Sequence, residues 1–473
     1  MMYSMRREVA FVTSIGALGV STGCDVNQVQ PQFETGSQDT DESGSADASS
    51  SSSSGSSGGS SSSSSSGTSE SSGSSGDDAV MGCDGDGEAM QPFGNHEFSY
   101  AEGIIIPSHK SQAELDSETI AFYQSWKSKW LRQGCGGYYV DADIGGAATV
   151  SEAHGYGMII AAYMAGADPD AREIFDGMFD HYRDHPSDGD ARLMAWYQDS
   201  SCNSTNGLNS AADGDLDIAY ALLLADKQWG SSGDVDYAFE AGRVMQGIWQ
   251  SETGDGFIHL GDWVSSGESF DATRASDFMP SHLASFEAAL GNGDFGGVRD
   301  ASYSIIESVQ TGSAPTTGLL PDFILSAASN PGPAYPGFLE GDFDGEYNFN
   351  ACRVPWRIGA DAVVNGDSRA KTIVDRMTSW ARSTTGDSAS GIRAGYWLDG
   401  DMLPNRDYIH LAYMAPFGVA AMTSADNQNW LNQLWNQVVT YQGNDTYYGD
   451  TIAMIDLIIM SGNYWAPENA PCG

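Results

Sequence analysis

Residues 150–166 read VSEAHGYGMIIAAYMAG, and the assignment of the fold starts from this stretch. It has the apolar character of a buried helix, yet Glu152 stands at its start. Ser151 as a cap and a carboxylate in the first turn are typical of an ordinary helix N-terminus. Gly155 and Gly157 do not fit that simple interpretation, because each costs about 1 kcal/mol relative to Ala inside a helix. We therefore expect another group to approach the backbone closely there.

Apolar residues with helical period continue through the chain after Pro92. The pattern predicts helices over 113–133, 152–165, 170–185, 214–228, 235–250, 280–290, 296–311, 354–364, 370–383, 408–422, 427–441 and 451–461. Twelve helices taken as six hairpins would close an all-α barrel, although periodicity alone also allows another large helical array. Two long connections, 254–276 and 330–350, are rich in Gly, Asp, Asn and aromatic residues. Long loops in a compact domain are usually functional, so we expect them to form an open cleft.

The composition indicates a globular chain with a strong negative charge. Of 473 residues, 40% are hydrophobic and 11% aromatic, which is enough for a large core. Lys and Arg number 21 against 64 Asp and Glu, a net charge of −43. Such a field repels nucleic acids and anionic membranes. We expect neither as a partner, and we expect a monomer.

The first 83 residues have the features of an export segment followed by a tether. Residues 1–24 combine two arginines, an apolar run and small residues, which predicts a secretory signal too short to span a bilayer. Cys24 after small residues is typical of a lipoprotein cleavage site, but Ser21 stands where an apolar residue is usual, so lipidation and ordinary cleavage both stay open. Residues 25–83 are rich in Ser and Gly and predict a flexible tether. The folded domain is predicted over 84–473, in a secreted or surface-attached protein.

Six cysteines fit an exported protein. Cys83 and Cys472 flank the folded part, and Cys135 with Cys202 is a second plausible pair, but spacing does not determine connectivity. No CxxC spacing occurs, so a zinc site of the usual kind is not expected. We predict no metal and no cofactor.

A second group of acids precedes a strongly apolar segment in ADGDLDIAYALLLAD, residues 212–226. Asp213, Asp215 and Asp217 alternate there. The segment lacks the turn glycine and distal glutamate of a calcium loop. A helix cap needs one aspartate rather than three. Either one aspartate caps the helix and the other two are solvent-exposed, or the three belong to a functional site.

The third group is EGDFDGEYNFNACRVPWRIGAD, residues 340–361. Four acids precede Arg353 and Arg357 at the start of a predicted helix, and either arginine could be part of a structural ion pair. Other polar and aromatic residues of the same kind stand on or near loops: Tyr156, Trp196, Trp263, Arg274 and Asp277. Acids, amides and aromatic rings are what a sugar-binding cleft needs, since rings stack on pyranose faces and carboxylates bind hydroxyls.

Cleavage of a glycosidic bond requires one protonated carboxyl and one ionised carboxylate. Glu152 at the mouth of an apolar helix is a reasonable acid, because burial raises the pKa of a carboxyl group. The helix dipole opposes this, so the acid role also needs a neighbouring negative charge, which Asp213 could supply.

The three segments together resemble glycoside hydrolase family 8 over most of residues 94–463. VSEAHGYGMIIA is similar to the segment of the general acid, ADGDLDIAYALLLAD to the family signature, and NACRVPWRIGAD to a third family segment. The resemblance implies an (α/α)6 barrel and an inverting endo-enzyme in which Glu152 donates the proton and Asp213 holds the sugar at the cleavage point. Gly155 and Gly157 would then leave room for a sugar chain or a packed neighbour.

One departure from the family pattern concerns the catalytic base. Many members carry an aspartate where this chain has Asn350, and an amide cannot take a proton from water at neutral pH. In the subgroup with asparagine there, the resemblance assigns the base to a glutamate of the preceding loop. Glu340 matches best, with Asp342, Asp344 and Glu346 as rivals.

The resemblance implies a β-1,4-glucan, of cellulose or mixed-linkage type, as the substrate. Chitosan is the alternative, because the Asn350 subgroup includes chitosanases and a cationic polymer is attracted to an acidic protein. Xylan fits less well. A third alternative is an inactive carbohydrate-binding surface lipoprotein that has lost its base.

Overall fold

A computed structural model describes residues 80–85, 87–254 and 256–472. The predicted signal segment 1–24 and residues 25–79 of the predicted tether lie outside this part, as does Cys24. No helix among the described residues has the length and apolar character needed to cross a membrane.

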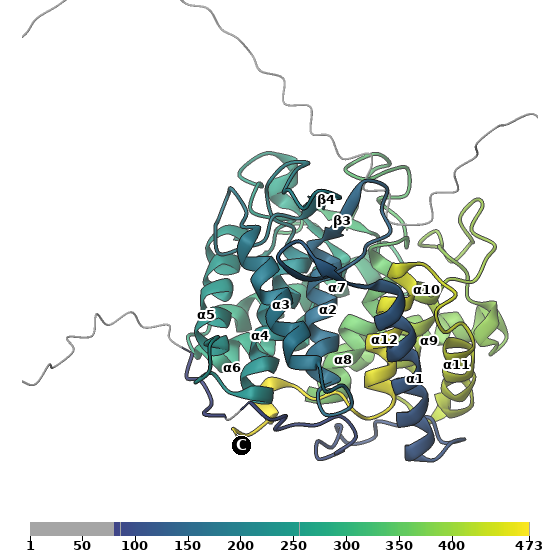
Figure 1. The fold of residues 1–473 in the computed structure, drawn as a ribbon. Coiled ribbons are helices and arrows are strands. Elements are labelled where there is room, and N and C mark those ends of the chain that lie inside the picture. The colour runs from purple at the N-terminus through teal and green to yellow at the C-terminus, as the bar shows by residue number, and fades with distance from the viewer. Residues whose placement is uncertain (1–79, 86, 255, 473) are drawn as a thin grey trace, which may run out of the picture. The chain divides into compact units, whose positions relative to one another are not determined.

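Six helices form a closed inner ring. Figure 1 shows the helices from the side of this ring. The six inner helices are α2 (Ser151–Tyr163), α4 (Ala212–Trp229), α6 (Pro280–Leu290), α8 (Val354–Asn365), α10 (Leu411–Ala421) and α12 (Tyr447–Met460). Each packs against the next in this order, and α12 packs against α2. Such a ring buries a helix from all sides, which is why α2, α4, α10 and α12 bury almost every residue.

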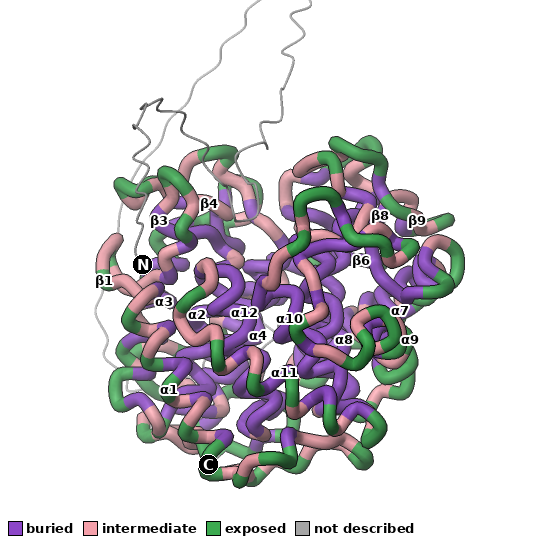
Figure 2. The backbone as a smooth tube through the Cα atoms, turned by 90° about the vertical axis from the view of Figure 1, so that its right-hand side faces the viewer, coloured by how far each residue is buried: buried purple, intermediate pink, exposed green. Residues whose placement is uncertain are grey.

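Six further helices lie outside the ring. They are α1 (Gln112–Trp130), α3 (Ala171–Asp184), α5 (Tyr237–Gly247), α7 (Asp294–Gly312), α9 (Ser368–Thr385) and α11 (Gln428–Thr440). The helices α3, α5, α7, α9 and α11 each pack against the inner helix that precedes them in the sequence, and α1 packs against α12. They bury one face and expose the other, so buried backbone lies inside and exposed backbone outside in Figure 2. The described residues therefore form the expected (α/α)6 barrel of six helical hairpins.

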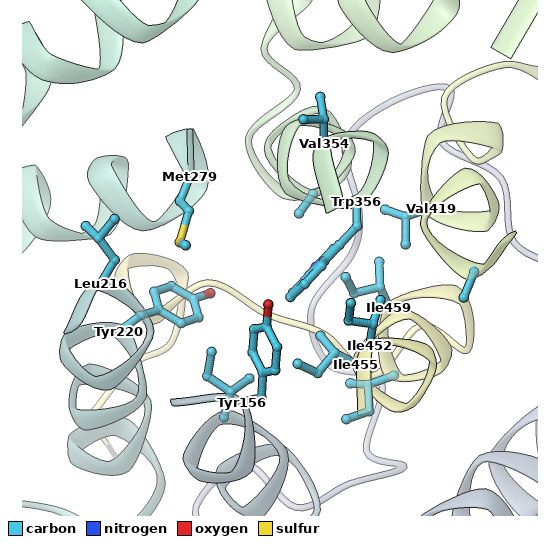
Figure 3. Close-up of a cluster of buried hydrophobic side chains, with 14 of the residues drawn as sticks. Tyr156, Leu216, Tyr220, Met279, Val354, Trp356, Val419, Ile452, Ile455 and Ile459 are labelled. Carbon is cyan, nitrogen blue, oxygen red and sulfur yellow. The ribbon is translucent and has the colours of Figure 1, made fainter. Parts of the chain in front are cut away.

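Aromatic and aliphatic side chains fill the barrel axis. Tyr156 from α2, Tyr220 from α4 and Trp356 from α8 meet there, and the isoleucines of α12 close the cluster (Figure 3). The core lies directly beneath the N-terminal ends of the inner helices, so it supports the residues that stand at those ends.

Short antiparallel strands connect the helices. The pairs are β1 (Leu131–Gly134) with β2 (Gly137–Val140), β3 (Ala147–Val150) with β4 (Tyr197–Asp199), and β5 (Thr253–Gly254) with β6 (Phe257–Ile258). The strands β7 (Ala272–Arg274), β8 (Phe323–Leu325) and β9 (Gly332–Pro333) form one sheet in that order. None of these strands was predicted from periodicity, because strands of two to four residues carry too short a pattern.

Several predicted helix boundaries differ from the structure by up to four residues, and two of these shifts have clear local reasons. The helix predicted over 113–133 ends at Trp130, because the chain turns back at Cys135 and Gly136, both with positive φ, to form the β1–β2 hairpin. The helix predicted over 451–461 begins at Tyr447, where the Thr446 hydroxyl caps it by accepting from the Gly449 N–H at 3.2 Å. The second shift matters, since it places Tyr447 in a first helical turn.

The cysteine pairs expected from their positions are confirmed. Disulfides join Cys83 to Cys472 and Cys135 to Cys202, and Cys352 is buried and unpaired. The first bond ties the start of the folded domain to its end. The second holds the β1–β2 turn against the loop that follows β4.

Packed neighbours, rather than a sugar chain, explain the two glycines of α2. A Cβ on Gly155 would lie 2.6 Å from the Cβ of Asp217 on α4, and one on Gly157 would lie 2.6 Å from Val140. The expected cap is also different, because Val150 is the N-cap residue and Ser151 is already helical, with no side-chain cap. Glycine therefore brings α2 and α4 into close contact just below Glu152.

Candidate active site

A pocket opens at the end of the barrel where several inner helices begin. It is lined by Ile144, Val150, Ser151, Glu152, Trp196, Ala211, Asp213, Arg274, Glu340, Asn350 and Tyr447. These residues come from the first turns of α2, α4 and α12, from the strands β3 and β7, and from the loops before α4 and α8. Segments far apart in the sequence thus meet at one place.

Glu152 projects into this pocket from the first turn of α2. The strand pair β3–β4 fixes its approach, since Val150 pairs with Tyr197 and the Ser151 N–H donates to the Trp196 carbonyl at 2.9 Å. Its carboxyl accepts from the Tyr447 hydroxyl and from Arg353 Nη1, both at 2.7 Å. Both oxygens of Glu152 are therefore held in a defined orientation.

The surroundings of Glu152 favour its protonated form. Burial raises the pKa of Glu152 to about 7, with the Arg353 charge opposing the rise and the Asp213 charge adding to it. A carboxyl group that keeps a proton near neutral pH is suited to general acid work. The neighbouring negative charge expected from the sequence is indeed in place.

Arg353 connects the acidic residues of the site. It lies in the turn Ala351–Arg353 before α8 and is fully buried. Nη1 donates to Glu152 Oε2 at 2.7 Å and to Asp213 Oδ2 at 2.9 Å. Nη2 donates to Asn350 Oδ1 at 2.8 Å. One guanidinium group thus sets the relative positions of three predicted site residues.

Asp213 remains ionised between two arginines. Its Oδ1 lies 3.3 Å from Arg274 Nη1, and its Oδ2 accepts from Arg353. Burial pushes the pKa of Asp213 upward, but Arg274 and Arg353 outweigh it and hold the pKa below its usual value. Its negative charge contributes to the raised pKa of Glu152.

Glu340 reaches the same pocket from the loop before α8. Asn350 Nδ2 donates to Glu340 Oε2 at 2.8 Å, and Arg274 Nη2 lies 3.9 Å from Oε1. The side chain of Glu340 is 22% exposed, so water can reach it. Burial raises the pKa of Glu340, while Arg274 and the Asn350 hydrogen bond oppose the rise.

The rival acids of this loop have other partners. Asp344 is buried and accepts the backbone N–H groups of Leu339, Glu340 and Gly341, which closes the loop around Glu340. Glu346 accepts the N–H of Leu398 at 2.8 Å, and Asp342 is exposed. Of the four candidates, Glu340 is the one that lines the pocket.

Five predicted substrate-binding residues do not line the pocket, and one of them, Arg353, is the buried arginine described above. Trp263 packs with Leu260 and Val264 in a separate apolar cluster. Tyr156, Asp277 and Arg357 are buried beneath the site. Arg357 forms an ion pair with Asp217, which is the structural alternative that its neighbouring acids suggested.

Asp277 is placed below Arg274 rather than in the pocket. Its Oδ1 accepts from the Ser276 hydroxyl at 2.9 Å and lies 3.9 Å from Arg274 Nη1. Burial raises the pKa of Asp277 to about 7, with Arg274 opposing the rise. Its position suits support of the arginine more than contact with substrate.

Tyr447 is a site residue that the sequence did not indicate. It stands outside the three recognised segments, and the predicted helix began after it. The only local signal is a tyrosine–tyrosine–glycine run before an apolar segment, which places an aromatic side chain at the N-terminus of a predicted helix. This signal is weak.

A family model confirms the resemblance. Residues 110–462 match the model of the glycosyl hydrolases family 8. The chain belongs to this family. A beta-glucanase of Niallia circulans is 44% identical over 378 residues, which is 79% of this chain and 91% of that protein. An endoglucanase of Bacillus sp. (strain KSM-330) is 37% identical over 391 residues, 80% of this chain and 82% of its own length.

Solved structures agree with the family assignment. The apo structure of a beta-1,3-1,4-glucanase from Paenibacillus sp. X4 has a TM-score of 0.77 and 44% sequence identity, covering 80% of this chain and 100% of its own. A cold-adapted family 8 xylanase has a TM-score of 0.62 at 17% identity over 76% of this chain and 97% of its own, which shows the shared fold. The chain is thus a glycoside hydrolase of family 8 with an (α/α)6 barrel.

Proposed function

We propose that this enzyme cleaves β-glucan chains internally, with inversion at the anomeric carbon. The observation that carries the proposal is the placement of Glu152 and Glu340 in one pocket, joined by Arg353 and Asn350. The names of the similar proteins, a beta-glucanase, an endoglucanase and a beta-1,3-1,4-glucanase, support the substrate class.

Glu152 acts as the general acid in this proposal. Its carboxyl donates a proton to the glycosidic oxygen as the bond between that oxygen and the anomeric carbon breaks. The pKa of Glu152 at about 7 keeps the proton available at neutral pH. The carboxylate left behind is stabilised by the two hydrogen bonds from Arg353 and Tyr447.

Glu340 acts as the general base. It takes a proton from a water whose oxygen forms the new bond to the anomeric carbon on the opposite face, so one displacement inverts the configuration. Hydrogen bonds link Glu152 to Glu340 through an arginine and an amide, Arg353 and Asn350. Space between acid and base for a water is what an inverting mechanism needs.

Asp213 and Trp196 bind the sugar in this proposal. The ionised Asp213 accepts hydroxyl hydrogen bonds at the cleavage point. The Trp196 ring is partly exposed and is anchored by a hydrogen bond from Nε1 to the Asn206 carbonyl at 2.9 Å, so it can stack on a neighbouring pyranose face. A carboxyl group that could serve as the base, that of Glu340, lines the same pocket as Glu152. This argues against a binding protein that has lost its base.

A reducing-end assay on lichenan, carboxymethylcellulose, xylan and chitosan tests the proposal. We expect activity on the two glucans, and a loss of about 10²–10⁴-fold in kcat for Glu152→Gln and for Glu340→Gln. Asp342→Asn, on the same loop but exposed, is the matched control and should keep wild-type activity. Fresh product observed by NMR should carry the α-anomer at its new reducing end.

Four outcomes would overturn this proposal or parts of it. Activity only on chitosan would replace the substrate class. Undiminished activity of Glu340→Gln would remove Glu340 as the base, and β-anomeric product would exclude inversion. A wild type inactive on every polymer would favour a carbohydrate-binding protein.

We further propose that the enzyme is exported and tethered through its first 83 residues. The support is the predicted signal segment 1–24 followed by a Ser/Gly-rich stretch. Labelling of growing cells with a fatty-acid probe tests lipidation at Cys24, with Cys24→Ala as the control. Label on the wild type alone would show a lipid anchor, and no label on either would leave ordinary signal cleavage.

A further inference from the structure

Three inner segments each present two functional side chains four residues apart, and therefore one helical turn apart on the same face. The pairs are Glu152 and Tyr156, Asp213 and Asp217, and Arg353 and Arg357. The first member of each pair belongs to the pocket or directly supports it. The second members form another layer one turn deeper, which we call the lower layer: Tyr156, Asp217 and Arg357.

The lower layer contains a closely paired buried salt bridge. Arg357 Nη1 donates to Asp217 Oδ1 at 2.7 Å, and Nη2 donates to Asp217 Oδ2 at 2.5 Å. His282 Nε2 lies 3.0 Å from the same Oδ1. All three side chains are buried. A two-pronged arrangement of this kind fixes orientation as well as distance.

Tyr156 connects the lower layer to the catalytic residues. Its ring lies 5.5 Å from the Arg357 guanidinium carbon and 5.7 Å from the Trp356 ring. Figure 3 shows Tyr156 rising from α2 toward Trp356 on α8. Its hydroxyl accepts from Arg353 Nη1 at 3.0 Å, the same nitrogen that donates to Glu152 and Asp213.

Close helix packing holds the two layers in register. A Cβ on Gly155 would lie 2.6 Å from Asp217 Cβ, and one on Gly214 would lie 2.5 Å from Ser151 Oγ. With glycine at both positions, α2 and α4 approach at the level between the layers. A shift of Asp217 is therefore transmitted to α2, which carries both Tyr156 and Glu152.

The charges around Arg357 are balanced without Glu152. Asp217 supplies the opposite charge. Burial lowers the pKa of His282 to about 4, so its imidazole is neutral at neutral pH. Asp456 on α12 also faces Arg357, and burial raises the pKa of Asp456 well above its usual value, which favours its uncharged form. The pair thus forms a neutral and rigid support.

We propose that Asp217 and Arg357 are positioning residues for the reaction, acting through Tyr156 on Arg353 and hence on Glu152 and Asp213. The proposal rests on the function given above. It assigns a catalytic consequence to a pair that touches no substrate. A displacement of reacting groups by about 1 Å can cost about 10²-fold in rate, so small movements in this layer are sufficient.

Two conservative variants test the proposal in the full-length enzyme. Tyr156→Phe keeps the ring and removes the hydroxyl that accepts from Arg353, and Arg357→Lys keeps the charge but loses the two-pronged geometry. We expect kcat on lichenan to fall by about 10- to 100-fold with little change in KM. The alkaline limb of the kcat–pH profile should move as well, since Arg353 sets the protonation of Glu152.

A matched control lies one turn further along α8. Asp361 accepts from Arg299 Nη2 at 2.7 Å and is as deeply buried as Asp217. Asp361→Asn should lower the melting temperature and leave kcat and its pH profile unchanged. If Asp361→Asn changes the profile as much as the lower-layer variants do, the effect is general loosening and the proposal is wrong.

A double variant decides the case in which the single variants fail to fold. Replacing a buried ion pair by apolar groups of similar size is often neutral for stability, whereas removing one partner is not. A folded Asp217→Leu/Arg357→Met double variant with wild-type kcat would overturn the proposal, and reduced kcat at unchanged KM would support it. A wild-type enzyme that is inactive on every polymer would instead refute the proposed function. Failure of the positioning proposal and failure of the proposed function are therefore distinguishable.

Discussion

Asn350 donates from Nδ2 to Glu340 Oε2 at 2.8 Å while its Oδ1 accepts from Arg353 Nη2 at 2.8 Å. The residue at the usual position of the base is thus an amide with both ends in use. An amide is suited to this place, because it donates to one carboxylate and accepts from one guanidinium without carrying a charge of its own. Asn350 thus orients the carboxyl group of Glu340, which stands ten residues earlier in the same loop.

Replacing Asn350 by aspartate should disturb Glu340. Two carboxyl groups at hydrogen-bond distance cannot both ionise readily, so the pKa of one of them rises. Because the base must be ionised, the acidic limb of the kcat/KM–pH profile should move to higher pH and activity near pH 6 should fall. Asn348→Asp, two residues earlier and outside the pocket lining, is the control. A wild-type profile for Asn350→Asp would contradict the role of Glu340.

The hydroxyl of Tyr447 should set the upper pH limit of activity. Glu152 must carry a proton, and its pKa is about 7, so kcat should fall as the pH rises through about 7. The Tyr447 hydrogen bond lowers the pKa of Glu152. Tyr447→Phe should therefore move the alkaline limb to higher pH.

The neighbouring tyrosine provides the comparison for that measurement. Tyr448 donates its hydroxyl to the Phe349 carbonyl rather than to Glu152. Tyr448→Phe should leave the alkaline limb where it is. A limb that shifts to lower pH in Tyr447→Phe would show that the hydroxyl does not stabilise the ionised form of Glu152.

Asp344 should control activity through the shape of the Glu340 loop. Its carboxylate accepts three backbone N–H groups between Leu339 and Gly341. In Asp344→Asn the NH₂ of the new side chain replaces one acceptor oxygen and faces backbone N–H groups, which are also donors. The hydrogen bonds lost in this way are worth about 1.5–3 kcal/mol each when the acceptor is charged. We expect kcat to fall at least about tenfold, with Asp342→Asn unaffected in the same assay. Equal activities for the two variants would show that the loop does not depend on Asp344.

Asp215 and Glu252 should make the fold less stable as the pH rises. Both are fully buried, and burial raises both pKa values well above the usual range, with the charge of Asp215 adding to the rise for Glu252. The folded state then holds protons that the unfolded chain releases above about pH 4. The free energy of unfolding is therefore highest below that pH. As the pH rises toward the raised pKa of the folded state, it falls by up to about 1.4 kcal/mol per pH unit for each of the two carboxyl groups.

Asp215→Asn should flatten this dependence. The asparagine oxygen can still accept from the Met194 N–H, as Asp215 Oδ1 does at 2.8 Å, and an amide has no proton to release as the pH rises. Denaturant unfolding at pH 5, 7 and 9 should give a smaller loss of unfolding free energy than in the wild type. The exposed Asp342→Asn should retain the wild-type slope, and an unchanged slope in Asp215→Asn would show that Asp215 does not hold a proton in the folded state that the unfolded chain releases.

Local sequence determined the helices and the identity of the acid segment. An apolar period of 3.6 residues is a property of ten to twenty consecutive residues, so the twelve α-helices of the described residues could be predicted. The errors lie at helix ends whose position is set by a cap or a hairpin. Glu152, Asp213 and the arginines were recognisable because they lie within continuous segments. The two cysteine pairs were only plausible from the sequence, and the structure determined their connectivity.

Tertiary structure alone decided what each of these residues touches. Glu152 meets Arg353 across 201 positions of sequence and Tyr447 across 295, and no local pattern encodes such contacts. Arg353 and Arg357 look equivalent in the sequence, yet one supports the pocket and the other pairs with Asp217 a turn deeper. Closure of the helical ring brings these distant segments together. Burial and neighbouring charge in that ring then decide which carboxyl keeps its proton.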